Sequence, residues 1–554
     1  NVRLDYTGSH SQSMNYNDGN GQIVKSSAYE NQNHAASLAF KFENHLLEFK
    51  GGQQHIPFQG FPTARMDLTN NDSIFGNVRY KGDFDWGNLE SKLYLENTSH
   101  SMNFGDDKFL GQPSYMAMPM ETRGRNLGYK VQAEIPFNNQ RDTLRVGNEF
   151  HSNKINDFWP PVIPMAGPTS LGAGMWPNTF INLNNGSRDR VGTFAEWEAT
   201  WSDKWKSNLG LRYDHTMTDT GNVATYNGDS NPAGPTTLPH TDQSNATRAF
   251  NSLDHARNFD TFDVTAFLQF TPNDLIQYEF GYARKNRMPS LYELYPWSTS
   301  GMMMTMIGTY GDGNGYVGNM NLKPETAHNV SFTAAYHDPK DNAWEIKATP
   351  YISYVENFID ADKCIAGNSV CTTAAASYSQ NPSYFRYLTL GNHDARLWGT
   401  DLSARTDLFT DKTLGAFGTH TVMSYVRGER MDGGNLYHMM PFNMKLALDH
   451  KLDSWKNMLE FQFVDGKSDV QQIRNELRTP SYILLNAKTG YTWKNLSVDV
   501  GLDNILDKQY YHPLAGAYTG DYYAMSLPTS GAAKVNKNLP GMGRSVFVGF
   551  TLTY

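Results

Sequence analysis

Apolar and polar residues alternate with a period of two along most of this chain, in segments of about ten residues. The alternation begins almost at once, with Val2, Leu4 and Tyr6, and it recurs to the end of the chain. The last segment places five apolar residues on one face, at Val546, Val548, Phe550, Leu552 and Tyr554. Successive side chains of a β-strand point to opposite faces, so the pattern predicts strands with one apolar face. About ten residues is also the length that a tilted strand needs to cross a membrane.

The predicted strands are joined by two kinds of connection. One kind is short and polar, as at 202–204 and 338–341. The other is long and irregular, at about 105–123, 156–187, 219–257, 289–324, 358–383 and 505–542. Short turns at one rim and long extracellular loops at the other are typical of outer-membrane barrels. We therefore predict an all-β fold, a transmembrane antiparallel β-barrel of about 20 to 22 strands that occupies residues 1–554.

Two segments allow a sharper prediction about the two faces of the wall. Residues 189–218 and 480–504 should be adjacent antiparallel hairpins with their short turns at the periplasmic rim. The apolar positions then face the lipid and the polar positions face the lumen. The predicted outward side chains are Trp197, Trp201, Leu209, Leu211, Leu496 and Val498.

Composition excludes a helical membrane protein and agrees with a barrel. The chain has 19% charged residues and a mean hydropathy of -0.57, and it lacks an apolar run of about 18 residues. A barrel strand needs apolar residues only at alternate positions, so low average hydropathy is expected. Aromatic residues make up 13% of the chain, which suits the aromatic girdles of a barrel. The net charge of -9 gives no support to a nucleic-acid partner.

The two cysteines, Cys364 and Cys371, lie close together in a polar stretch within one predicted loop. A loop on the outer surface is reached only through an oxidising compartment, which favours a disulfide. The alternative is a pair of free thiols.

Three segments resemble the motifs of TonB-dependent outer-membrane receptors. They are Arg287-Met-Pro-Ser-Leu-Tyr-Glu-Leu-Tyr295, Gly318-Asn-Met-Asn-Leu-Lys-Pro-Glu-Thr326 and Leu502-Asp-Asn-Ile-Leu-Asp-Lys-Gln-Tyr510. In that family the first two motifs flank a long extracellular loop, and the third precedes the last extracellular loop. The resemblance implies a protein of the Gram-negative outer membrane, a barrel of about 22 strands, and energy supplied by TonB with ExbB and ExbD.

The resemblance is incomplete at the N-terminal side. Family members carry a globular plug with a TonB box ahead of the barrel, and neither is recognisable here. We therefore expect the plug domain to be absent from this chain, which leaves a passive porin as a competing function. The expected partners are outer-membrane lipid and lipopolysaccharide around a single barrel, which is expected to be a monomer.

Methionine clusters suggest a cargo. The chain has 23 methionines, and many of them lie in predicted loops. The clusters are Met116, Met118 and Met120; Met302, Met303, Met304 and Met306; His438 with Met439 and Met440; and His100 with Met102. Thioethers are soft ligands, and a set of thioethers with imidazole suits Cu(I) better than zinc or iron. Import of copper, free or chelated, is therefore favoured. Copper would be the transported ligand, and no cofactor is required.

Other functions remain open or are disfavoured. The same methionines could be apolar packing, or could line an apolar pocket for an iron siderophore. A haem receptor of the resembling family would carry a histidine between Pro289 and Asn319, and this chain has none there, although methionine could be an axial ligand. The glycine-rich stretch 311–315 predicts a flexible turn. No nucleophile, phosphate-loop or HExxH motif is present, so we expect no enzyme.

Overall fold

The computed structural model describes residues 1–108, 118–162, 175–176, 178–226, 241–299, 301–364, 371, 386–519 and 537–553. A single sheet of 21 strands dominates them. The first strands are β1 (Val2–Ser13), β2 (Tyr29–Phe42), β3 (His45–Gln59), β4 (Asp67–Phe84), β5 (Gly87–Asn103), β6 (Met120–Phe137), β7 (Asp142–Trp159), β8 (Phe180–Thr200), β9 (Trp205–Asp219), β10 (Arg257–Asn273) and β11 (Ile276–Arg287). The others are β12 (Gly315–Tyr316), β13 (Glu325–His337), β14 (Trp344–Lys363), β15 (Tyr387–Asp411), β16 (Gly415–Arg430), β17 (Asn443–Leu452), β18 (Trp455–Val464), β19 (Tyr482–Trp493), β20 (Leu496–Asp503) and β21 (Ser545–Leu552).

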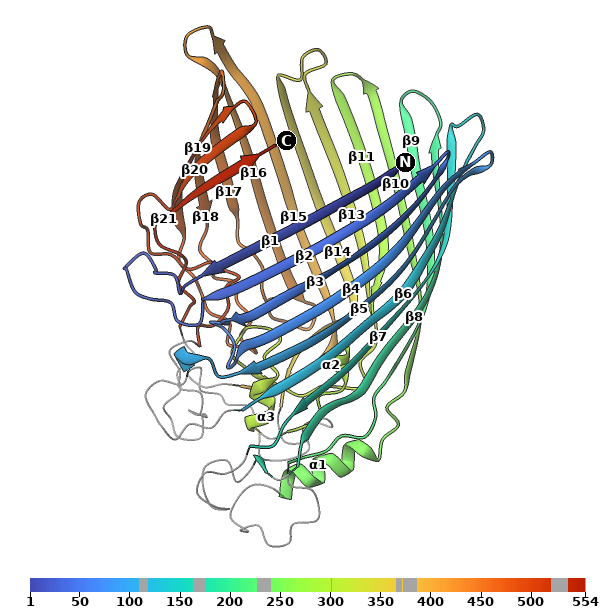
Figure 1. Cartoon of the computed structure of the whole chain (residues 1–554), viewed down its shortest axis with the longest axis vertical. Coiled ribbons are helices and arrows are strands. Elements are labelled where there is room, and N and C mark those ends of the chain that lie inside the picture. The colour runs from blue at the N-terminus through green and yellow to red at the C-terminus, as the bar shows by residue number, and fades with distance from the viewer. Residues whose placement is uncertain are drawn as a thin grey trace.

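The strands follow one another as an antiparallel meander. Each long strand pairs with the next long strand along the chain, from the β1–β2 ladder to the β20–β21 ladder. The short strand β12 is different, because it lies parallel to the start of β15. Figure 1 shows the resulting tilted wall of strands curving around a lumen. The all-β barrel predicted from the alternation is confirmed.

The two ends of the wall differ as predicted. Short turns join the strands at one end, for example between β8 and β9 and between β19 and β20. The long connections gather at the other end, the loop end, together with the helices α1 (Thr241–Asn251), α2 (Leu291–Leu294) and α3 (Gly301–Met306) (Figure 1). A short 3₁₀ helix, Asp106–Lys108, also lies in one of these connections. Among the residues placed by the structure, no helix has the length and apolar character needed to span a membrane.

A contact between β9 and a loop fixes which face of the wall is inward. The hydroxyl of Thr218 lies 2.8 Å from the hydroxyl of Tyr295, which belongs to the loop folded against the wall. Even-numbered residues of β9 therefore face the lumen and odd-numbered residues face outward. Trp197 is in register with Leu209, and its ring packs edge-on against Trp201. The outward prediction is confirmed for Trp197, Trp201, Leu209 and Leu211.

The second hairpin has the same arrangement. Tyr482 and Leu484 of β19 are buried in an apolar cluster at the loop end. Leu496 and Val498 pair with the odd-numbered residues of β19, so they lie on the opposite, outward face. One part of the prediction was wrong, because the two hairpins are not neighbours. The meander places the strands from β10 to β18 between them, since each strand pairs with its neighbour in sequence.

The main apolar core lies at the loop end, where the ends of the strands meet the loops. Its largest fully buried side chains include Trp159, Phe180 and Tyr295. The ring of Phe180 stacks on Trp159 at 4.5 Å between centroids and on Trp297 at 5.1 Å. These contacts hold the loops together over the lumen, where they form the candidate site.

Candidate functional site

The paired motif forms a clasp between two neighbouring strands. Arg287 ends β11, and its guanidinium binds Glu325, the first residue of β13, at 2.7 Å. The same guanidinium binds Glu293 of α2 at 2.9 Å. Ser290 caps α2, and the Glu293 side chain completes a capping box. These residues have a structural role, because their contacts fix the point at which the chain leaves the wall and enters α2.

Two tyrosines of this segment hold α2 against the inner wall. The hydroxyl of Tyr292 donates to the carboxylate of Asp157 in β7 at 3.2 Å. The hydroxyl of Tyr295 contacts Thr218 and also donates to the carbonyl oxygen of His255 at 2.9 Å. The loop between the two motifs is therefore anchored to β7 and β9.

A cavity of about 720 Å³ lies between α2, the segment after α3 and the inner wall of β4 to β7. It brings together six side chains of the soft-donor or imidazole type from segments that are far apart in sequence. They are Met66, His100, Met102, Met120, Met306 and His438. Five of these residues were predicted as ligands, and Met66 was not. The rest of the lining includes apolar residues such as Ile307 and Leu514, several uncharged polar groups, and the ionisable side chains of Arg65 and Asp157.

The strand register explains why the wall presents these residues together. Met102 of β5 is directly opposite Met120 of β6, and His100 is opposite Thr122. Opposed residues in an antiparallel pair point to the same face, so two thioethers lie side by side with an imidazole one step deeper.

Both histidines are prepared to act as neutral ligands. The Nδ1 atom of His100 lies 3.2 Å from the side-chain oxygen of Asn71. An amide oxygen only accepts, so Nδ1 carries the proton and Nε2 keeps its lone pair. His438 is held by its backbone N–H, which donates to Glu476 at 3.0 Å. Burial, and next the charge of Lys467, lower the pKa of His438 to about 4, so its ring is neutral at neutral pH.

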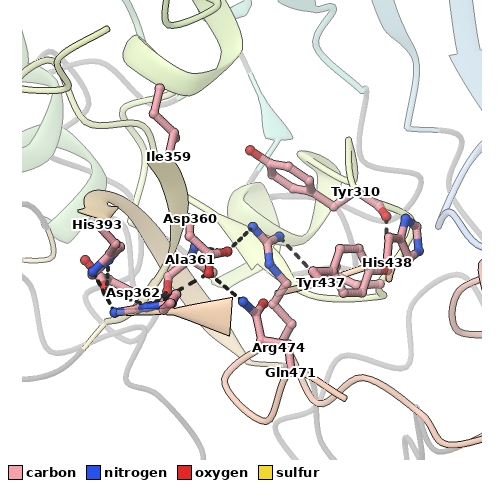
Figure 2. Close-up of polar contacts among 12 residues, drawn as sticks. Tyr310, Ile359, Asp360, Ala361, Asp362, His393, Tyr437, His438, Gln471 and Arg474 are labelled. Carbon is pink, nitrogen blue, oxygen red and sulfur yellow. Dashed lines mark hydrogen bonds and ion pairs between the residues drawn. The ribbon is translucent and has the colours of Figure 1, made fainter. Parts of the chain in front are cut away.

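A buried ionic cluster supports the His438 side of the cavity (Figure 2). The guanidinium of Arg474 binds Asp360 at 3.1 Å and lies 3.5 Å from Asp312. It also lies over the Tyr310 ring at 4.3 Å and the Tyr437 ring at 5.1 Å. The Tyr437 hydroxyl donates to the carbonyl oxygen of Tyr310 at 3.3 Å. Arg474 therefore links several loops. It holds in place the segments whose residues Tyr310 and His438 line the cavity.

The other predicted ligands are placed elsewhere. Met118 and Met303 are buried in the main apolar core and do not line the cavity, whereas Met120 and Met306 belong to the same core and do line it. Met304 packs on Cys364, Met439 packs against Leu436, and Met440 packs against Val464. The neighbours of His438 in sequence thus pack in apolar clusters, because His438 lies in a turn with a φ of 59° and the chain changes direction there. Met116 and the side chain of Met302 lie outside the described residues.

Cys364 and Cys371 form a disulfide, as predicted. The bond is buried beside Met304 and Val317. We expect intact-mass and peptide mass spectrometry without reduction to find the two cysteines linked in more than about nine-tenths of the protein, as a structural disulfide in an oxidising compartment should be. Alkylation of both thiols before reduction would contradict the bond.

Sequence reasoning missed several residues of the site. Asn71, Thr122 and Asp157 line the cavity but belong to no motif, and Tyr292 lies within the first family motif but was not predicted as a site residue. The available signal was their inward position on strands or beside a motif. The stretch 311–315 was predicted to be a flexible turn; the chain bends at 311–313, and Asp312 is buried there and faces Arg474.

Within the ranges covered by the structure, no group of three or more His, Cys, Asp and Glu side chains is arranged to hold a metal ion.

Comparison with known families decides the class of the protein. Residues 5–505 match the model of the TonB dependent receptor-like β-barrel. The chain belongs to this family. It is accordingly a protein of the Gram-negative outer membrane, and its loop end is the extracellular end.

The curated relatives that match this chain are named for haem use. The heme/hemopexin utilization protein C of Haemophilus influenzae is 26% identical over 266 residues, which are 45% of this chain and 33% of that protein. The chain thus spans about a third of the length of the curated relatives that it matches.

Solved structures show the same fold at low identity. The copper transporter OprC has a TM-score of 0.76 and 17% identity, covering 100% of this chain and 78% of that chain. The FrpB iron transporter of Neisseria meningitidis has a TM-score of 0.66 and 12% identity, covering 100% of this chain and 77% of that chain. At this identity the likeness establishes the fold and leaves the cargo open.

Proposed function

We propose that this receptor imports copper, bound as Cu(I) in the cavity at the extracellular end of the barrel. The observation that carries the proposal is the convergence of Met102, Met120 and Met306 with His100 and His438 around one cavity. These residues come from β5, β6, the end of α3 and the loop after β16.

The donor set favours Cu(I) for a chemical reason. Thioethers are soft and uncharged, and they bind Cu(I) well but zinc and iron poorly. The two imidazoles are neutral and can complete a three- or four-ligand site.

The family supplies the rest of the proposal. Transport would draw its energy from TonB with ExbB and ExbD. The receptor would work as a monomer surrounded by lipid and lipopolysaccharide. The fold neighbour named as a copper transporter is consistent with this cargo.

The purified receptor should bind Cu(I) at least about 100-fold more tightly than Zn(II), because soft donors discriminate between these ions. Competition against a Cu(I)-specific chromophoric chelator, with a parallel zinc titration, measures the ratio. Equal affinity for the two ions would contradict the proposal, and so would binding of an iron siderophore with no copper binding.

Haem is the second candidate, because His100 and His438 line the same largely apolar cavity and relatives are named for haem use. Haem iron accepts histidine or methionine as axial ligands. The two candidates separate in one titration: a haem receptor should produce a sharp Soret band at one haem per chain, abolished in the double variant His100→Ala, His438→Ala. We expect no such band.

A further inference from the structure

A band of four polar side chains crosses the wall beside the two thioethers. Asn71, His100, Thr122 and Asp157 are successive register partners on β4, β5, β6 and β7. All four line the cavity. Because register partners share a face, the band is continuous, and it lies two residues, or about 7 Å, from Met102 and Met120.

Asp157 is the charged end of this band. Its side chain is 1% exposed and accepts three hydrogen bonds, from Asn182 at 2.7 Å, Tyr292 at 3.2 Å and Thr122 at 3.3 Å. All three donors are uncharged. In the part of the chain that the structure describes, no lysine, arginine or histidine forms an ion pair with Asp157.

Other buried carboxylates at the loop end, unlike Asp157, form ion pairs with basic side chains. Asp67 is paired with Lys108 at 2.6 Å, and Asp360 is paired with Arg474 at 3.1 Å. Such pairing is expected, because a carboxylate removed from water is costly unless a cation faces it. Within the described residues Asp157 forms no such ion pair and faces the cavity, whose lining also includes the side chain of Arg65.

The size of the cavity also indicates a ligand larger than a metal ion. A water molecule occupies about 30 Å³, and a metal ion held by protein ligands needs no more space than that. The cavity measures about 720 Å³ and combines apolar walls with a few fixed polar groups. That combination is characteristic of a site for an organic molecule.

We propose that Asp157, with Thr122 and Tyr292, receives a positively charged amino group of an organic ligand that carries the metal. The cargo is then an amine-bearing copper chelate, with its metal at Met102 and Met120 and its ammonium group at Asp157. This inference rests on the proposed function, because the thioethers must bind the copper.

A matched pair of chelators tests the inference. Cysteamine and N-acetylcysteamine present the same thiolate to Cu(I), but only cysteamine carries an ammonium group. The full chain should bind the Cu(I)–cysteamine complex about tenfold or more tightly than the N-acetylated complex, as expected for a charge-assisted hydrogen bond in a buried site. Calorimetry at neutral pH measures both affinities.

Variants identify the residue responsible. Asp157→Asn keeps the shape and removes the charge. The variant should bind the cysteamine and N-acetylcysteamine complexes with about equal affinity. Asp72→Asn makes the same chemical change on β4 at a side chain that is 55% exposed and binds His55, and it should leave the preference unchanged. Thr122→Val keeps the volume and should weaken the preference, which gives a second reading if Asp157→Asn fails to show the heat-modifiable migration of a folded barrel.

The outcomes separate the two proposals. Equal binding of the two Cu(I) complexes by the unmodified chain would overturn this inference alone. A preference that survives in folded Asp157→Asn would also overturn it. Failure to bind Cu(I) from either complex would overturn the proposed function, and this inference with it.

Discussion

A variant with Met102, Met120 and Met306 all replaced by Leu should lose Cu(I) affinity by about 100-fold or more while its barrel remains intact. Changes to groups that merely orient metal ligands cost about 10- to 100-fold, so removal of three ligands should cost at least as much. Leu retains the apolar volume and removes the sulfur, so packing is little disturbed. Competition with a Cu(I) chelator gives the affinity, and heat-modifiable migration reports the barrel.

The matched control replaces three methionines that the structure places in packing positions, Met118, Met303 and Met439. The same chemical change there should leave Cu(I) affinity within about twofold, because Leu and Met exchange conservatively in cores. Equal losses in the two variants would show that the methionines act through packing. Undiminished Cu(I) affinity in the first variant would show that these three methionines do not bind copper.

Replacing Arg474 with Leu should release the extracellular loops around the His438 side of the cavity. The guanidinium is 3% exposed and compensates Asp312 and Asp360, which are also buried. Removing one partner of a buried ion pair costs about 3 to 5 kcal/mol, because the remaining charges stay uncompensated. Local opening should therefore become about 150- to 5,000-fold more frequent.

Hydrogen exchange with mass spectrometry can detect this effect in peptides from 308–316 and 467–476. Peptides from the barrel wall, such as those of β18, should exchange as before. Arg544→Leu is the control, because that residue lies on the same end of the barrel in an ion pair of 3.7 Å with side chains 54% and 42% exposed. A surface pair contributes little, so its loops should keep their protection. Similar exchange in the two variants would show that Arg474 is dispensable.

The fold was predictable because barrel strands satisfy a simple local rule. A wall with lipid on one side and a polar lumen on the other requires alternation at every second residue, and a single sequence displays that directly. The position of Leu209 on the outer face follows from the same rule. The arrangement of hairpins was less accessible, since alternation says which residues share a face but not which hairpins are neighbours.

The candidate site was predicted only in part. The soft character of the methionine clusters was visible in the sequence, and so was the pairing of Cys364 with Cys371. Which methionines act together was not visible. Met304 and Met306 are two residues apart, yet one packs on the disulfide and the other lines the cavity. Spacing along a short helix does not reveal what each face will meet.

The sequence by itself determined the barrel, the asymmetry of its two ends, the family resemblance and the presence of soft donors in the loops. The tertiary structure decided which donors converge, that Asn71 sets the tautomer of His100, and that Asp157 lines the cavity without an ion pair among the described residues. The physical reason is the range of the interactions. Strand alternation is a property of neighbouring residues, whereas the cavity depends on register between β4, β5, β6 and β7 and on ion pairs such as Arg474 with Asp360, whose members are 114 residues apart.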